Sequence, residues 1–146
     1  MKFLGAILCI ALSVLSFNAL SITLISAKEA ALPPASSNKL STRGISRGPA
    51  IKLNAPVIDP VESPFDFKVT FEPRGGVGID ADSVKVVYLK FPYIDLTSRI
   101  KSAITASGID LPKAEVPPGN HSIRVTVKDT EGRESQSEFS LVVVKP

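Results

Sequence analysis

The sequence predicts an all-β domain, a sandwich of about seven short strands in a Greek key with one short helix. Two observations support this prediction. Residues 65–72 and residues 121–129 alternate between apolar and polar side chains, which places one face of each strand on a core and the other in water. Turn residues separate the predicted strands, and the chain shows no strand–helix alternation and no glycine-rich phosphate loop followed by a helix. The pattern therefore does not fit a parallel α/β fold.

Residues 1–27 have the features of an export signal. Lys2 precedes an uncharged, mostly apolar run that ends at Ser26, and small residues lie near its end. A positive start, an apolar run and a small-residue cleavage site are typical of a secretory signal peptide. We expect cleavage after Ala27, with Ile25 at the third position before the cut. Because roughly 20 uncharged residues suffice to cross a bilayer, a retained inner-membrane anchor is the alternative.

Residues 28–49 are rich in Ala, Ser and Pro and show no apolar periodicity. Such a segment buries too little surface to offset the entropy lost on ordering, so it is predicted to be a flexible linker. The predicted domain then spans residues 50–146. Its acidic and basic residues nearly balance. Nucleic-acid binding depends on clustered positive charge, and no nucleic-acid partner is therefore expected.

Three strands are predicted before the helix. Residues 50–53 form a short first strand, which Pro56 ends. The second strand, residues 65–72, places four apolar side chains on one face: Phe65, Phe67, Val69 and Phe71. Burial of each large side chain stabilises the fold by roughly 1.5–3 kcal/mol, so this strand is expected to be central to the core. Residues 83–89 form the third strand.

A helix is predicted over residues 96–106, lying across one end or edge of the sandwich. One apolar stripe runs along it, made of Leu96, Ile100, Ala103 and Ile104. Asp95 is the expected N-cap, because its carboxylate can accept bonds from free backbone N–H groups. Gly108 is the expected left-handed residue after the helix, with Ile109 packing back on Ile104. Residues 109–116 would follow as a short strand, and Pro112 marks it as an edge.

The last two strands form a predicted hairpin. The turn residues Pro117-Pro118-Gly119-Asn120 precede the strand at 121–129, and the turn Asp129-Thr130-Glu131-Gly132 follows it. The final strand alternates Phe139, Leu141 and Val143, with Val142 and Val144 on its other face. That end is expected either to be covered by neighbouring strands or to be an edge open to strand addition.

This hairpin resembles the closing pair of strands in bacterial immunoglobulin-like and cadherin-like domains. The likeness covers roughly the last 30 residues well and the rest loosely. It implies an immunoglobulin-like β-sandwich, an architecture that serves many unrelated functions.

Two groups of residues are candidates for binding. Tyr88, Phe91 and Tyr93 form an aromatic group that could stack on a sugar or anchor a partner protein. The alternative is that Tyr88 belongs to the core and the other two pack the helix onto the sheet. Four loop carboxylates could bind calcium, which takes six to eight oxygen ligands: Asp80, Asp82, Asp129 and Glu131. The alternative is that Asp82 caps a strand start and Asp129 forms a hairpin turn.

Enzymatic activity is not expected. Cys9, the only cysteine, lies in the leader, so the domain has no disulfide and no cysteine metal site. His121, the only histidine, lies beside a turn, where a half-exposed side chain is ordinary, and its neighbour Ser122 points to the opposite face. A carboxylate-pair hydrolase is the remaining enzymatic possibility. No catalytic residue and no cofactor are assigned.

The expected function is that of an exported, non-enzymatic binding or structural module of the cell envelope. Its expected location is the periplasm or the cell exterior, with membrane contact only through an uncleaved N-terminal segment. The expected partner is another envelope protein or a surface glycan. A carbohydrate-binding or calcium-binding accessory domain is the alternative.

Overall fold

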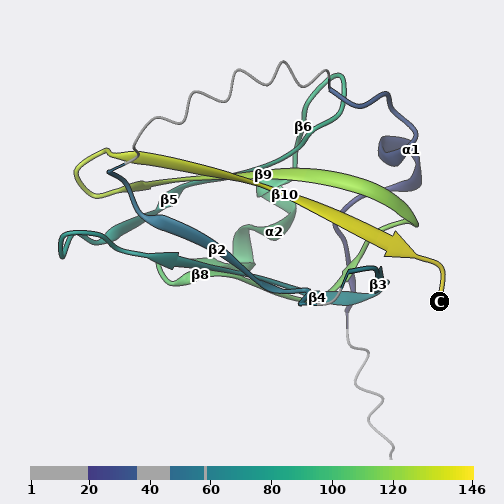
Figure 1. The fold of residues 1–146 in the computed structure, drawn as a ribbon, viewed down its shortest axis with the longest axis horizontal. Coiled ribbons are helices and arrows are strands. Elements are labelled where there is room, and N and C mark those ends of the chain that lie inside the picture. Colours follow the sequence, from purple (N-terminus) through teal and green to yellow (C-terminus); the bar gives the residue numbers. More distant parts are fainter. Residues whose placement is uncertain (1–19, 36–46, 58) are drawn as a thin grey trace, which may run out of the picture.

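The computed structural model describes residues 20–35, 47–57 and 59–146, and shows two sheets packed face to face (Figure 1). The first sheet has the order β1 (Ile22–Thr23), β8 (Gly108–Glu115), β4 (Phe65–Glu72) and β2 (Ala50–Ala55), and β7 (Ile104–Thr105) pairs with β8. The second sheet has the order β3 (Val61–Glu62), β10 (Glu134–Val144), β9 (Gly119–Asp129), β5 (Ile79–Tyr88) and β6 (Ile94–Asp95). The helical elements are short: α1 (Ala27–Ala30), α2 (Thr97–Ile100) and a 3-10 turn, η1 (Lys101–Ala103).

The strand order is that of an immunoglobulin-like Greek key. Along the chain, β4 and β8 belong to the first sheet, whereas β5, β9 and β10 belong to the second. The long strands within each sheet are antiparallel. The consecutive strands β2 and β3 lie at the edges of different sheets, and β3 runs parallel to the end of β10. This topology confirms the predicted all-β, immunoglobulin-like sandwich. The predicted export signal or membrane anchor, residues 1–27, falls largely on residues 1–19, outside the described residues.

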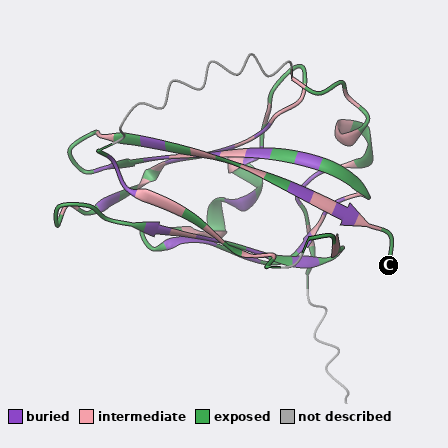
Figure 2. Ribbon diagram, viewed as in Figure 1, coloured by how far each residue is buried: buried purple, intermediate pink, exposed green. Residues whose placement is uncertain are grey.

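The core lies between the two sheets, and the alternation of the sequence determines its composition (Figure 2). All four apolar side chains predicted for the second strand are buried in β4. Strand β9 alternates in the same way from His121 to Asp129. In β10, Leu141 and Val143 are buried, while Phe139 is half-buried. The predicted core faces of these strands are therefore confirmed.

The helix predicted over 96–106 is shorter than expected. Helical structure covers only α2 and η1, and the chain extends again at β7. The Asp95 carboxylate accepts a bond from Thr97 N–H at 2.8 Å, although Asp95 belongs to β6 and no side chain caps α2 through its N-cap residue Leu96. Ile104 and Ile109 do meet, but as a cross-strand pair of β7 and β8. A β-hairpin of β7 and β8 forms in place of the end of the predicted helix, because these two strands extend the first sheet.

Gly108 is needed for a reason other than helix capping. It begins β8 with a φ of +149°, and a Cβ at this position would lie 1.9 Å from the carbonyl oxygen of Val69. A side chain here would collide with the backbone of β4, so glycine permits the close approach of the two strands. The predicted role of Gly108 as the left-handed residue after a helix is wrong.

Strand β8 lies inside the first sheet, between β4 and the short strands β1 and β7. Pro112 lies in an irregularity of the β4–β8 ladder, beside Lys113, whose φ is +52°. The Asp66 carboxylate accepts a bond from the Lys113 N–H at 3.3 Å, which stabilises this bulge. The proline thus marks a bulge in a strand whose outer side is only partly covered.

Residues 20–35 form a strap across one end of the sandwich, so the first part of the predicted linker, residues 28–35, contacts the domain, whereas residues 36–46 of that linker lie outside the described residues. Strand β1 pairs in parallel with β8, and Leu24 and Ile25 are 0% and 1% exposed. Helix α1 follows, and Pro34 then bridges to Lys90 in the loop after β5. The folded unit therefore includes residues that precede the predicted start of the domain at residue 50. No helix within the described ranges combines the length and apolarity needed to cross a membrane.

The end of β10 is covered rather than open. Val143 and Val144 pair with Val61 and Glu62 of β3, and the Val142 N–H donates to the Asp59 carboxylate at 3.1 Å. These contacts favour the covered alternative over strand addition at this position.

Candidate functional site

Of the aromatic candidates, Tyr88 ends β5, and Phe91 and Tyr93 lie on the loop between β5 and β6, at the strap end of the molecule (Figure 1). The strap fixes this loop through its backbone. Phe91 N–H donates to the Pro33 carbonyl at 2.9 Å, and Ala35 N–H donates to the Leu89 carbonyl at 3.2 Å. The loop is held on its second side by the bond from Leu89 N–H to the Ser122 carbonyl of β9.

The structure separates the three predicted aromatic residues. Tyr88 is 0% exposed and belongs to the core, as one of the alternatives anticipated. Phe91 and Tyr93 are 72% and 60% exposed. They do not pack α2 onto the sheet, so that part of the alternative is wrong. Two exposed rings on a fixed loop form a surface, and we call Phe91 and Tyr93 the aromatic pair.

Charged side chains border the aromatic pair. The Arg124 guanidinium lies 5.8 Å from the centre of the Tyr93 ring, a cation–π contact. Glu138 holds Arg124 in place, accepting from its Nε at 3.0 Å and its Nη2 at 2.8 Å. Arg124 and Glu138 share the outer face of the second sheet, because Arg124 lies opposite both Glu138 of β10 and Val87 of β5. The aromatic pair therefore continues into a mixed-charge sheet face.

His121 is buried, and the expectation of a half-exposed side chain is wrong. It is 1% exposed, with Nδ1 2.8 Å from the Tyr88 hydroxyl and Nε2 2.7 Å from the Pro117 carbonyl oxygen. A carbonyl only accepts, so Nε2 carries the proton and Nδ1 accepts from Tyr88. Burial lowers the pKa of His121, and the bond to Pro117 opposes this without overcoming it. Burial also raises the pKa of Tyr88 to about 12.

This arrangement is structural. Both ring nitrogens of His121 are engaged with protein groups, and its position near the start of β9 matches the place of the tyrosine corner in immunoglobulin-like sandwiches. The period-two alternation already placed His121 on the same face as Ile123, so its burial could have been inferred. Its partner Tyr88 comes from a distant strand, and local sequence carries no signal for that contact.

The predicted calcium ligands lie toward the opposite end, near the turn between β9 and β10. The Asp80 carboxylate accepts from Asp82 N–H at 3.0 Å, where the pairing of β5 with β9 becomes irregular. Asp129 is 4% exposed; one oxygen accepts from the N–H groups of Glu131 and Arg133, and the other from Arg133 Nε at 2.7 Å. Burial acts to raise the pKa of Asp129, but the bonds and charge of Arg133 hold it below its usual value.

Backbone N–H groups thus bond the Asp80 and Asp129 carboxylates, and Arg133 pairs with Asp129 and Glu131. In the part of the chain that the structure describes, no group of three or more His, Cys, Asp or Glu residues could hold a metal ion. The anticipated turn at Asp129 is observed, whereas Asp82 takes part through its N–H as the residue capped by Asp80. Calcium binding stays a prediction for a titration to test.

One further pair of carboxylates shares a surface hollow. Asp82 and Asp95 line a hollow of about 510 Å³ beside α2, together with Thr97 and Lys101. Bonds from the Thr97 side chain and backbone lower the pKa of Asp95. A general acid of a hydrolase needs the opposite, a raised pKa. Asp95 is therefore held in its charged form and is not suited to act as a general acid.

An ion pair that sequence reasoning missed ties the strap to α2. Arg99 donates through both terminal nitrogens to the Glu29 carboxylate, with Nη1 2.8 Å from Oε2, and Nη1 also lies 2.9 Å from the Leu24 carbonyl oxygen. The bond with Arg99 is the main reason that the pKa of Glu29 falls to about 2. A capping box of Ser26 and Glu29 begins α1, and its Ser-x-x-Glu pattern was the available sequence signal for this helix.

Comparisons with known proteins add similarities of fold. No family model and no curated protein matches this chain. Among solved structures, CopC from Methylosinus trichosporium OB3b has a TM-score of 0.39 at 14% identity, covering 59% of this chain and 84% of that one. The fibronectin(III)-like modules of Clostridium thermocellum CbhA give 0.38 at 15%, covering 66% of this chain and 47% of theirs. Murine CRIg gives 0.40 at 10%, covering 67% and 98%.

Proposed function

We propose that this chain is an exported, non-enzymatic binding module of the cell envelope, and that it binds another protein through the aromatic pair and the adjoining face of the second sheet. Export rests on the signal-like N-terminal sequence, and places the domain in the periplasm or outside the cell. The binding surface rests on one observation: Phe91 and Tyr93 are largely exposed on a loop whose backbone the strap holds.

Exposed aromatic side chains on a fixed backbone suit protein recognition. Aromatic rings supply large contact areas with few rotatable bonds, so little entropy is lost when they bind. Here the bonds from Phe91 and Ala35 already order the loop before any partner arrives. Large exposed apolar groups are costly in water, and a partner that covers them offsets that cost.

The surroundings of Tyr93 favour a protein over a glycan. Sugars stack on a free ring face, whereas Arg124 already lies over the Tyr93 ring. Tyrosine and arginine are common among the residues that dominate protein interfaces, and Glu138 keeps Arg124 in position. A partner with an apolar centre and charged groups of both signs at its rim would complement this surface.

Site-specific photo-crosslinking tests the proposal. A photoreactive residue at Phe91 or Tyr93 is expected to capture the same envelope protein, and one at Val57, which is 87% exposed, is expected not to capture it. With that protein purified, Phe91→Ala should weaken binding by about 2 kcal/mol or more, roughly thirtyfold, and Val57→Ala should leave it unchanged. Equal weakening by both variants would reject the aromatic pair as the contact.

Calorimetry with a glycan panel and with calcium tests the alternative. If a glycan binds wild type and Phe91→Ala removes the signal while no protein is captured, the module binds carbohydrate. A calcium signal that Asp80→Ala and Asp129→Ala remove would restore the calcium hypothesis.

A further inference from the structure

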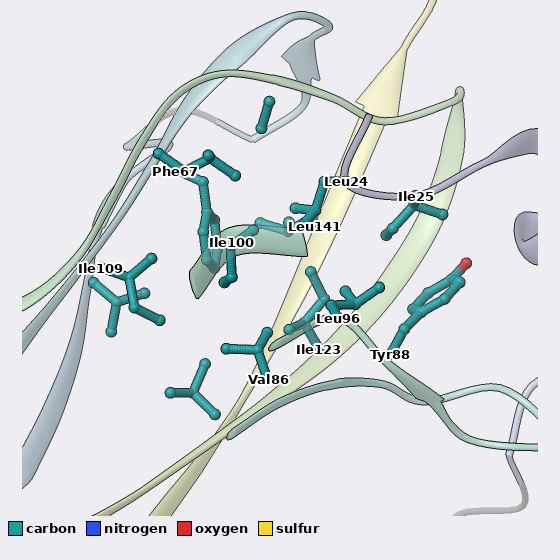
Figure 3. Close-up of a cluster of buried hydrophobic side chains, with 14 of the residues drawn as sticks. Leu24, Ile25, Phe67, Val86, Tyr88, Leu96, Ile100, Ile109, Ile123 and Leu141 are labelled. Carbon is teal, nitrogen blue, oxygen red and sulfur yellow. The ribbon is translucent and has the colours of Figure 1, made fainter. Parts of the chain in front are cut away.

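Residues 22–27 belong to the folded domain, although the sequence had assigned them to the export signal. Leu24 and Ile25 are 0% and 1% exposed and lie in the central cluster with Phe67, Leu141 and Tyr88 (Figure 3). Ile22 packs half-buried against the same cluster. Removing these residues would strip two fully buried side chains from the core, the kind of change that costs most in folded proteins.

The backbone of this segment also makes hydrogen bonds with the rest of the domain. Leu24 N–H donates to the Glu115 carbonyl at 3.0 Å, and Leu24 carbonyl accepts from Arg99. Ser26 caps α1, with its N–H donating to the Glu29 carboxylate at 2.9 Å. A cut after Ala27 would delete β1, the cap of α1 and one of the three bonds that hold Arg99.

The change from exposed to buried side chains occurs just before this segment. Leu20 is 86% exposed and Ser21 is exposed, whereas burial begins at Ile22. The sequence Ala19-Leu20-Ser21 places small residues at the first and third positions before the Ser21–Ile22 bond. This matches the small-residue pattern of signal cleavage better than Ile25 and Ala27 do.

The same burial argues against a retained anchor. With residues from Ile22 onward in the domain, the uncharged run left to cross a bilayer ends near Ser21. Leu20 and Ser21 lie at the surface of the folded unit, which leaves Phe3–Ala19 at the lower limit of the roughly 17–25 residues that a membrane helix needs.

We infer that the export signal is cut between Ser21 and Ile22, so that the mature chain begins with β1 and keeps residues 22–35 of the strap. The inference rests on the export part of the proposed function. Hydrolysis of this peptide bond by a leader peptidase consumes one water and leaves a carboxylate on Ser21 and an ammonium group on Ile22.

The structure offers that ammonium group a counter-charge. The Glu115 carboxylate accepts bonds from the hydroxyls of Ser21 and of Thr23, the latter at 3.3 Å. The new N-terminus would therefore form between two residues that already contact Glu115. Its positive charge would replace the lost bond from Ser21.

Intact-mass measurement and N-terminal sequencing test the inference. The full chain is expressed in a Gram-negative host and recovered from the periplasm, and the expected N-terminus is Ile22. Ser21→Gln should leave the precursor as the main species, whereas Ala27→Gln should be processed like wild type. Ala27 is exposed in the fold, so both substitutions spare the core.

A mature chain that begins at Lys28, with Ala27→Gln blocking its formation, would overturn the inference while leaving export intact. An unprocessed chain retained in the cytoplasm would overturn both the inference and the proposed export. As a second measurement, chains made to begin at Ile22 and at Lys28 are compared by melting temperature. The shorter chain should melt on the order of 10 °C lower or fail to fold, and equal melting temperatures would contradict the inference.

Discussion

Strand β9 buries a polar side chain near each of its ends, and the two ends are built differently. At the strap end, His121 is neutral and is bonded to Tyr88, a residue 33 positions away in the sequence. At the hairpin end, Asp129 is charged and is bonded to Arg133, only 4 positions away. The strap end therefore depends on segments that meet only in the complete fold. The hairpin end can form from one short stretch of chain.

This difference predicts which substitutions should lower the stability of the fold most. At the strap end, apolar burial and long-range bonds act together, as Leu24 and Arg99 show. At the hairpin end, many polar contacts join residues only two to four positions apart, such as the bond from Asp82 N–H to Asp80. Substitutions at the strap end are thus expected to cost more than those at the hairpin end.

The largest effect is expected from Leu24→Ala. This substitution empties a fully buried position under the strap and should lower the free energy of unfolding by about 2–5 kcal/mol. Val57→Ala, at an exposed site, is the control and should change it by less than about 0.5 kcal/mol. Denaturant unfolding measures both. Similar small values for the two would show that the strap does not contribute to the core.

A smaller loss is expected from Tyr88→Phe. The ring stays buried, but Nδ1 of His121 loses its donor, and an unpaired buried polar atom costs about 1–3 kcal/mol. The matched control is Tyr93→Phe, which removes a hydroxyl from an exposed ring. Equal stability of these two variants would contradict the bond between Tyr88 and His121.

Acidification should affect the strap end first. Burial lowers the pKa of His121 below 6.5, so below pH 6.5 the unfolded chain binds more protons than the folded chain. The contribution of His121 to the free energy of unfolding is therefore full above pH 6.5 and declines as the pH falls below it. Glu29, with its pKa lowered from 4.5 to about 2, loses its contribution only below pH 4.5. Unfolding free energies at pH 7 and pH 5 test this order. His121→Gln, which removes the only histidine, should abolish the difference.

The smallest effect is expected from Asp80→Ala at the hairpin end. It removes one local, exposed bond to Asp82 N–H near the start of β5 and should cost less than about 1 kcal/mol. Hydrogen exchange should show faster opening limited to the start of β5. If Asp80→Ala lowered the free energy of unfolding as much as Leu24→Ala does, the expected difference between the two ends would be contradicted.

The contrast also explains what could be predicted from sequence. Alternation depends on neighbours two residues apart, so the core faces of β4 and β9 were predicted correctly. The turn at Asp129 is likewise local. The helix over 96–106 was predicted too long because the pairing of β7 with β8 was not visible in its apolar stripe.

The strap could not be predicted for a related physical reason. An apolar segment such as Leu24-Ile25 serves equally well as part of an export signal or as part of a core, and local pattern does not distinguish these uses. Its partners Arg99 and Glu115 lie far along the chain. For the aromatic pair, sequence supplied the residues, and only the fold separated the exposed Phe91 and Tyr93 from the buried Tyr88.

The position of the strap has a consequence for the order of folding. Its residues come early in the chain, yet they contact β8 and α2, and Thr23 and Glu115 are 92 positions apart. Closing so long a loop costs conformational entropy, and contacts among the other strands must form first to offset this cost. We expect the strap to dock after the transition state, so that Leu24→Ala mainly accelerates unfolding and changes the refolding rate little. Stopped-flow kinetics would detect this, and a slowed refolding rate would place the strap in the folding nucleus.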